Sequence, residues 1–84
     1  MEDAKVADIR AKIATLSNRE QQVLDGLVAG HPNKTIAFDL GISHRTVEVY
    51  RANLMTKMGA TTLSDLVRMA VLTGSLPENS SSPR

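Results

Sequence analysis

The sequence predicts an all-α fold of four helices, preceded by a short linker helix and followed by a disordered tail. Apolar residues recur every three or four positions in most segments, and no segment sustains the alternation typical of a strand. Capping residues such as Ser, Asn and Gly flank the periodic segments. The chain has 84 residues and no cysteine, so helix packing has to hold one small domain together without a disulfide.

The first periodic segment covers residues 4–15 and predicts a short amphipathic linker helix. Its apolar positions are Val6, Ile9 and Ile13. A clearer helix begins after Ser17, which can cap it while Glu20 reaches back to the Ser17 amide in a capping box. Gly30 and the following Pro32 mark the end of this helix.

Two further helices lie on either side of Gly41. Asn33 is a favourable N-cap residue for a helix of about two turns that ends at this glycine. Ser43 or His44 then begins a longer helix, which Gly59 ends. The core positions predicted on the longer helix are Val47, Tyr50, Leu54 and Met58.

The last helix is predicted over about residues 62–73, with Gly74 after its end. Its apolar face consists of Leu63, Leu66, Val67, Ala70 and Val71. Some of these side chains exceed what so short a core can bury, which favours a dimer surface on this helix.

The order of these segments divides the chain into three parts. Residues 1–15 are interpreted as a linker, residues 16–74 as the domain and residues 75–84 as the disordered tail.

The pair of helices around Gly41 has the features of a helix-turn-helix. Ala37 supplies the small side chain needed where two helices approach closely, and Gly41 tolerates the positive φ of a tight turn. The apolar residues that would lock the two helices together are Ile36, Leu40, Ile42, Val47 and Tyr50. In this motif the second helix is presented to the major groove of DNA.

The outward face of the helix predicted over residues 44–58 has a composition suited to reading bases. With 100° per residue counted from Val47, the outward residues are Arg45, Glu48, Val49, Ala52 and Thr56. Arginine can pair with guanine, glutamate can accept from cytosine, and valine or alanine can contact a thymine methyl group. The first-turn amides with the Ser43 and Thr46 hydroxyls form a natural phosphate site.

Positive charge is concentrated in the same part of the chain, although the net charge is only +1. Residues 31–60 contain Lys34, Arg45, Arg51 and Lys57 against two acidic residues, whereas in residues 1–30 acidic residues outnumber basic ones. This distribution favours a nucleic-acid partner for the middle of the chain.

Several motifs in this order resemble the DNA-binding domain of LuxR/FixJ-type regulators: LSNREQQVL, NKTIA, ISHRTVEVYRANL and KMGA. The resemblance covers about residues 10–74. It implies that the helix over residues 44–58 reads bases through Arg45, Glu48, Val49 and Ala52. The residues it places near phosphates are Lys34, Ser43, Thr46, Arg51 and Lys57. His44, at the start of the same helix, is a further DNA-binding candidate, although it departs from the residue common in the family. The resemblance also implies that the last helix pairs two copies through Leu63, Leu66, Val67, Ala70 and Val71.

The resemblance further implies the effector domain of a bacterial transcription regulator, of the two-component response-regulator kind. Its expected partners are double-stranded DNA, a second copy of the chain in a weak dimer, RNA polymerase, and a covalently attached N-terminal receiver or sensor domain. No cofactor is expected, and the expected location is the cytoplasm. The acidic start and residues 4–15 are interpreted as the end of an interdomain linker, so that the chain is an excised effector domain.

Some alternatives stay open at the level of sequence. Lys57 can contact DNA or form an ion pair with Glu20, and Tyr50 can lie in the core or read a base. A protein-interaction module built on the same scaffold is the rival function. An enzyme, a metal site and a membrane span are not expected, because His31 and His44 lack further ligands and no apolar run approaches about 20 residues.

Overall fold

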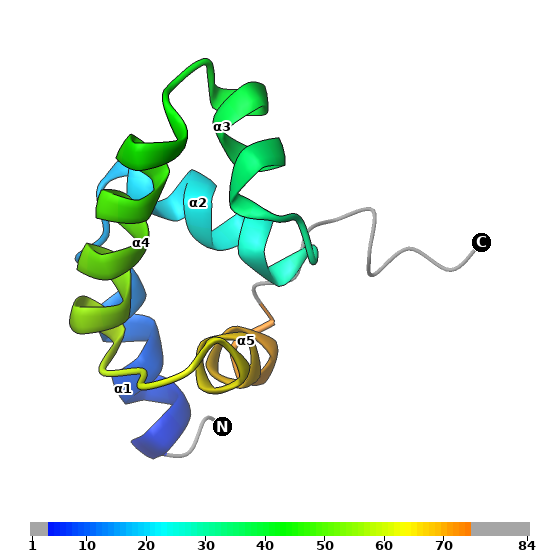
Figure 1. Ribbon diagram of the computed structural model, residues 1–84. Coiled ribbons are helices and arrows are strands. Elements are labelled where there is room, and N and C mark those ends of the chain that lie inside the picture. The colour runs from blue at the N-terminus through cyan, green and yellow to red at the C-terminus, as the bar shows by residue number, and fades with distance from the viewer. Residues whose placement is uncertain (1–3, 75–84) are drawn as a thin grey trace.

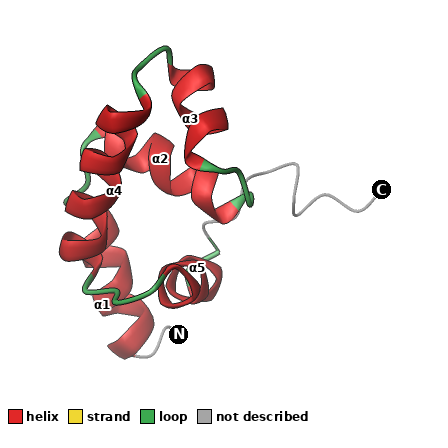
Figure 2. Cartoon of the chain, in the orientation of Figure 1, coloured by secondary structure: helices red, strands yellow, loops and turns green. Residues whose placement is uncertain are grey.

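In the computed structural model, which describes residues 4–74, five helices follow one another along the chain. They are α1 (Ala4–Ile13), α2 (Asn18–Val28), α3 (Asn33–Leu40), α4 (His44–Met58) and α5 (Leu63–Leu72). The described part contains no strand, which confirms the all-α prediction (Figure 2). The predicted tail, residues 75–84, lies outside the described residues.

The helices enclose one core, to which every helix contributes. Figure 1 shows α3 and α4 on either side of the turn that joins them, while α5 lies near the other end of α4. The largest fully buried side chains are Leu24, Leu54, Met58, Leu66, Val23 and Val47. The core positions predicted on α4 are confirmed, since Val47, Leu54 and Met58 are buried and Tyr50 packs partly buried against them. The core interpretation of Tyr50 therefore holds.

The N-terminal helix belongs to this core. Ile9 is only 4% exposed and packs with the buried residues of the other helices. Since α1 packs against α4 and α5, the predicted linker helix is present and is also docked on the domain. Burying an isoleucine side chain stabilises a fold by about 1.5–3 kcal/mol, so Ile9 contributes to the attachment of α1. The predicted boundary at residue 16 stays a prediction.

The helix ends follow local sequence with one exception. The capping box at α2 is confirmed, because the Glu20 amide donates to Ser17 Oγ at 3.1 Å and the Ser17 amide donates to Glu20 Oε1 at 2.9 Å. The N-cap prediction for Asn33 is wrong. Pro32 is the N-cap of α3, without a side-chain cap, and its carbonyl accepts from the Ile36 amide at 3.1 Å. Proline suits this position because its φ is already close to the value that the extended N-cap backbone needs.

Replacing Ser17 by alanine is expected to lower the free energy of unfolding by about 0.5–2 kcal/mol, because the Glu20 amide loses its acceptor. Urea unfolding followed by circular dichroism would measure the change. Ser64→Ala on the exposed surface of α5 is the matched control and should shift stability by less than about 0.5 kcal/mol. Equal effects of the two substitutions would contradict the capping role.

Within residues 4–74, no helix has the length and apolar character needed to cross a membrane. The same residues contain no group of three or more metal-ligating side chains.

Candidate nucleic-acid interface

The turn between α3 and α4 sets how α4 is presented. Gly41 has φ of 69°, in the left-handed region that glycine adopts without steric cost, which confirms the role predicted for it. The Ile42 amide donates to the Ala37 carbonyl at 3.0 Å and closes the end of α3. Ala37 and Ile36 are both buried on α3, and α3 packs against α4. These contacts hold the helix-turn-helix geometry expected from the sequence.

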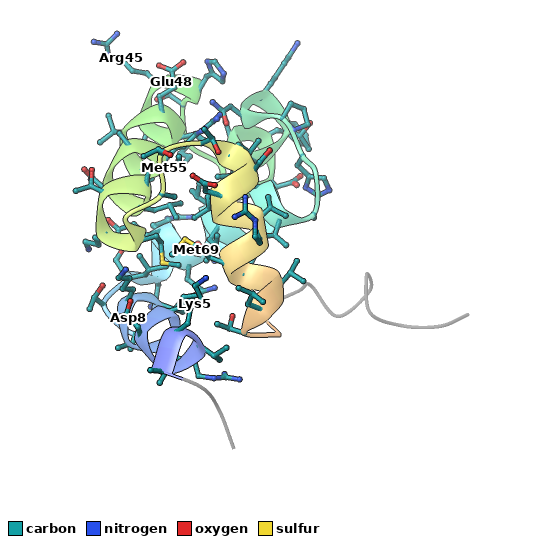
Figure 3. All side chains as sticks on the ribbon, turned by 90° about the horizontal axis from the view of Figure 1, so that it is seen from below. Lys5, Asp8, Arg45, Glu48, Met55 and Met69 are labelled. Carbon is teal, nitrogen blue, oxygen red and sulfur yellow. The ribbon has the colours of Figure 1, made fainter. Side chains whose placement is uncertain are left out.

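The outward face of α4 lies where the helical period predicted it. All five residues of this row are exposed: Arg45, Glu48, Val49, Ala52 and Thr56. We call them the α4 outer row. Val49 is 54% exposed at its centre, whereas Val47 on the opposite side is completely buried. Figure 3 shows Arg45 and Glu48 pointing away from the body of the domain. The α4 outer row is therefore free to contact a flat or grooved partner.

The start of α4 carries a polar cap. Ser43 Oγ accepts the Thr46 amide at 3.0 Å and shares a 2.8 Å hydrogen bond with Thr46 Oγ1. The first-turn amides of His44 and Arg45 have no partner inside an α-helix, so they are available to an anion. The two hydroxyls are thus engaged with each other at the predicted phosphate site.

His44 and Glu48 lie one turn apart on α4 and face each other. His44 Nδ1 is 3.6 Å from Glu48 Oε2, and each side chain is 57% exposed. Because both groups stay in contact with solvent, this pair is weak and leaves the glutamate free to reorient. His44 thereby flanks the acceptor that was predicted to read a base.

Lys57 has an internal partner, which bears on the two alternatives left by the sequence. Its Nζ lies 2.7 Å from Glu20 Oε1 and 3.4 Å from the Thr15 carbonyl oxygen. The Glu20 side chain is 6% exposed, while that of Lys57 is 40% exposed. The ion pair connects the C-terminal turn of α4 to the start of α2. The structure thus favours a packing role for Lys57 over a phosphate contact.

Arg51 is also held from within, although less closely. Its Nη1 donates to Asn33 Oδ1 at 3.4 Å, which links the middle of α4 to the first residue of α3. Arg45 and Lys34 are exposed and have no charged partner among the described residues. Of the four predicted cations, Arg45 and Lys34 are therefore the ones available to a ligand without breaking an internal contact.

The Glu20–Lys57 pair predicts a dependence of stability on pH. The Lys57 hydrogen bond, followed by the Ser17 amide, lowers the pKa of Glu20 below its ordinary value of 4.5. A carboxyl group with a lower pKa in the folded state stabilises the fold above the unfolded pKa, and this contribution disappears as the pH falls through the folded pKa. Glu20→Gln removes the charge and keeps a residue that capping boxes accept.

We therefore expect the free energy of unfolding of the unsubstituted chain to fall more steeply with acidification below about pH 4.5 than that of the Glu20→Gln variant. Urea titrations at a series of pH values would measure both slopes. Asp65 contributes in the same sense to both proteins, because the Thr61 hydroxyl lowers the pKa of its carboxyl group. Parallel pH profiles would show that the Lys57 contact has no influence on stability.

The predicted dimer surface on α5 needs a correction. Leu66 and Ala70 are completely buried in the core of the domain and cannot face a second copy. The other three predicted residues follow one side of the helix at intervals of four: Leu63 and Val71 are exposed and Val67 is half-buried. Leu72, which the prediction omitted, is 46% exposed next to Val71. The apolar face of α5 is thus divided between the core and an outer stripe.

Phe38 on α3 is the main feature that the sequence-based prediction missed. It is 85% exposed, more than any other large apolar side chain that the structure describes. Phe38 lies about 200° around the helix from Ile36, which is buried, so the helical period could have placed it outside. Arg19 on α2 also contacts this helix, because its Nη1 donates to the Leu40 carbonyl at 3.4 Å.

The comparison with known families gives a clear match. Residues 14–70 match the family described as "Bacterial regulatory proteins, luxR family" (GerE). The chain is 60% identical over 82 residues to the transcriptional regulatory protein FixJ of Azorhizobium caulinodans, covering 98% of this chain and 38% of that protein. It is 64% identical over 67 residues to FixJ of Rhizobium meliloti, covering 80% of this chain and 33% of the relative.

Solved structures agree with these sequence matches. The solution structure of the C-terminal transcriptional activator domain of FixJ from Sinorhizobium meliloti aligns with a TM-score of 0.76 at 60% identity, over 93% of this chain and 96% of that one. Full-length FixJ from B. japonicum aligns with a TM-score of 0.80 at 57% identity, over 88% of this chain and 36% of that one. The chain thus spans between a third and two fifths of the full-length relatives named above. Its sequence, helix order and similarity to these proteins agree, and the chain belongs to the LuxR family of bacterial regulatory proteins.

Proposed function

We propose that the chain is the sequence-specific DNA-binding effector domain of a bacterial transcription regulator, and that α4 reads the major groove. The observation that carries this proposal is the α4 outer row, in which Arg45, Glu48, Val49 and Ala52 are exposed together on a helix whose other side is locked in the core. An α-helix fits the major groove, and these residue types match the donors, acceptors and methyl groups of base edges.

Phosphate contacts in this proposal come from the periphery of the α4 outer row. Lys34 and the first-turn amides at His44 and Arg45 supply them, with Ser43 and Thr46 next to those amides. Arg51 can reach a phosphate by giving up its 3.4 Å contact with Asn33. Lys57 contributes its charge at a distance while it holds Glu20.

The regulator is proposed to act as a dimer in the cytoplasm. The exposed stripe formed by Leu63, Val67 and Val71, with Leu72 beside it, is the surface that would pair two copies. Relatives such as the response regulator protein TodT of Pseudomonas putida, 43% identical over 65 residues, support a two-component regulator with a receiver domain attached to this chain. Two helices presented by a dimer would meet half-sites about 34–36 Å apart.

Selection of binding sites from a random duplex library, in about 0.15 M salt, tests the proposal directly. We expect an enriched motif with a repeated half-site. The Arg45→Ala variant should lose about 1–3 kcal/mol of binding free energy and relax one base position, because a bidentate contact to guanine is worth that much. Weak binding without any motif from the unsubstituted chain would refute sequence-specific reading.

Salt titrations distinguish the two lysines. Lys34→Ala should weaken binding to all duplexes alike and reduce the slope of log affinity against log salt by about 1, as expected for one lost phosphate contact. Lys57→Met should destabilise the fold and leave that slope nearly unchanged, since the Lys57 ammonium group is already paired with Glu20. The reverse pattern would exchange the roles assigned to the two residues.

A further inference from the structure

His44 and Glu48 form a pair that helix stability does not explain. His44 is the first residue of α4, and Glu48 lies one turn further along the same face. A cation placed four residues before an acid stabilises a helix less than the reverse order does, and a positive charge in the first turn opposes the helix dipole. Both side chains are 57% exposed, so neither belongs to the core. The pair therefore has to be interpreted through the surface that it occupies.

The contact between the two side chains depends on the charge of the histidine. His44 Nδ1 lies 3.6 Å from Glu48 Oε2, which is too long for a hydrogen bond, so a charged imidazole attracts the carboxylate and a neutral one does so weakly. Oε1 of the same carboxylate is left to accept from another donor, such as the amino group of a cytosine. Figure 3 shows Glu48 pointing away from the body of the domain, beside Arg45.

Among residues 4–74, Glu48 is the one acid that forms an ion pair with His44. α2 and α3 pack against α4. Their charged side chains form no ion pair with either member of the pair: Arg19, Glu20, Asp25, Lys34 and Asp39. α1 lies near the other end of α4, where Lys57 reaches the Thr15 carbonyl (Figure 1). The charge of His44 thus acts mainly on Glu48, with Arg45 next to it in the chain.

We propose that protonated His44 positions Glu48 to read a cytosine, so that the base preference of α4 depends on the charge of this histidine. The inference rests on the proposed function and names the residue that tunes it. In the free domain water screens the pair, whereas a groove that excludes water strengthens the same attraction. The positive imidazole also offsets the repulsion between the Glu48 carboxylate and the phosphates.

Acid should strengthen this effect. Histidine is the side chain that changes its charge between about pH 5 and 8. In the complex the charged imidazole gains an unscreened carboxylate and nearby phosphates, so the complex binds more protons than the free domain does. By linkage, one such proton changes affinity by at most about tenfold per pH unit. The fold itself is not affected in this range, because the Lys57 and Thr61 hydrogen bonds lower the pKa values of Glu20 and Asp65.

Fluorescence anisotropy at about pH 6 and about pH 8 tests the proposal with two duplexes, namely the selected one and a copy altered at the base pair that Glu48→Gln relaxes. The unsubstituted chain should prefer the selected duplex about threefold or more strongly at the lower pH. His44→Gln should weaken the preference and make it independent of pH. His44→Arg keeps a positive charge throughout, so it should retain the preference at both pH values. His31→Gln, at the other histidine of the chain, should behave like the unsubstituted protein.

Three results would overturn this inference alone. Glu48→Gln might relax no base pair, His44→Gln might keep the preference and its pH dependence, or Glu48→Gln might keep a pH effect of unchanged size. The last result would show that His44 acts on phosphates and not through Glu48. Failure of the unsubstituted chain to select any motif would instead refute the proposed function, and this inference with it.

Discussion

Replacing Leu54 by alanine is expected to destabilise the domain by about 2–5 kcal/mol and to leave much of the chain unfolded at room temperature. Leu54 is completely buried on α4 and belongs to the core cluster to which α1, α2, α3 and α5 contribute. Alanine would remove its contacts with them and leave a cavity that rigid helices fill only in part. A domain of fewer than about 80 residues rarely has more than about 3–5 kcal/mol to lose.

Urea unfolding and thermal unfolding would measure this loss, and circular dichroism of the helices would follow both transitions. Asn53→Ala is the neighbouring control, because Asn53 is exposed and its truncation should change stability by less than about 0.5 kcal/mol. A loss below about 1 kcal/mol for Leu54→Ala would show that the core can close around the shortened side chain.

Val49→Glu is expected to weaken binding to the selected duplex by about 10- to 100-fold and to leave stability nearly unchanged. Val49 is 54% exposed at the centre of the α4 outer row, so the substitution disturbs no packing. In the proposed complex the new carboxylate would lie in a groove rich in negative charge, and it would replace an apolar contact with a base methyl group.

The control for this variant is Val49→Gln, which has nearly the same size as glutamate without its charge. Glutamine should lose only the apolar contact and should therefore bind more tightly than the glutamate variant. Fluorescence anisotropy with the duplex at two salt concentrations would separate the charge effect from the contact effect. If the unsubstituted chain and the Val49→Glu variant bound the duplex with equal affinity, the proposal that α4 contacts DNA would be contradicted. Leu54 and Val49 thus lie on one helix, but substitutions at the two positions are expected to act differently. The first should unfold the domain, and the second should weaken its binding to DNA.

The local features of the fold were predictable from the sequence. The capping box of Ser17 and Glu20, the left-handed turn at Gly41 and the cap at Ser43 each involve residues a few positions apart. Hydrogen bonds over such short separations depend mainly on local backbone geometry. The N-cap of α3 was mistaken because Asn33 and Pro32 can both occupy that place, and the asparagine side chain instead accepts a hydrogen bond from Arg51 on another helix.

The direction of the α4 outer row was also predictable, since Val47 identifies the inner side and the helical period fixes the rest. The sequence did not predict which apolar side chains of a helix are buried by the rest of the domain. The pattern on α5 identifies an apolar face but does not tell that Leu66 and Ala70 enter the core while Leu63 and Val71 remain outside. This division depends on where α5 packs against α2 and α1.

By itself the sequence determined the class of fold, the positions of the helices within a few residues, the turn at Gly41 and the row of side chains that α4 turns outward. Only the tertiary structure decided that Lys57 pairs with Glu20, that Ile9 brings α1 into the core and that Phe38 lies exposed on α3. The physical reason is distance along the chain. Caps and helical periods act between neighbours, whereas ion pairs and burial depend on helices that meet only after the chain has folded.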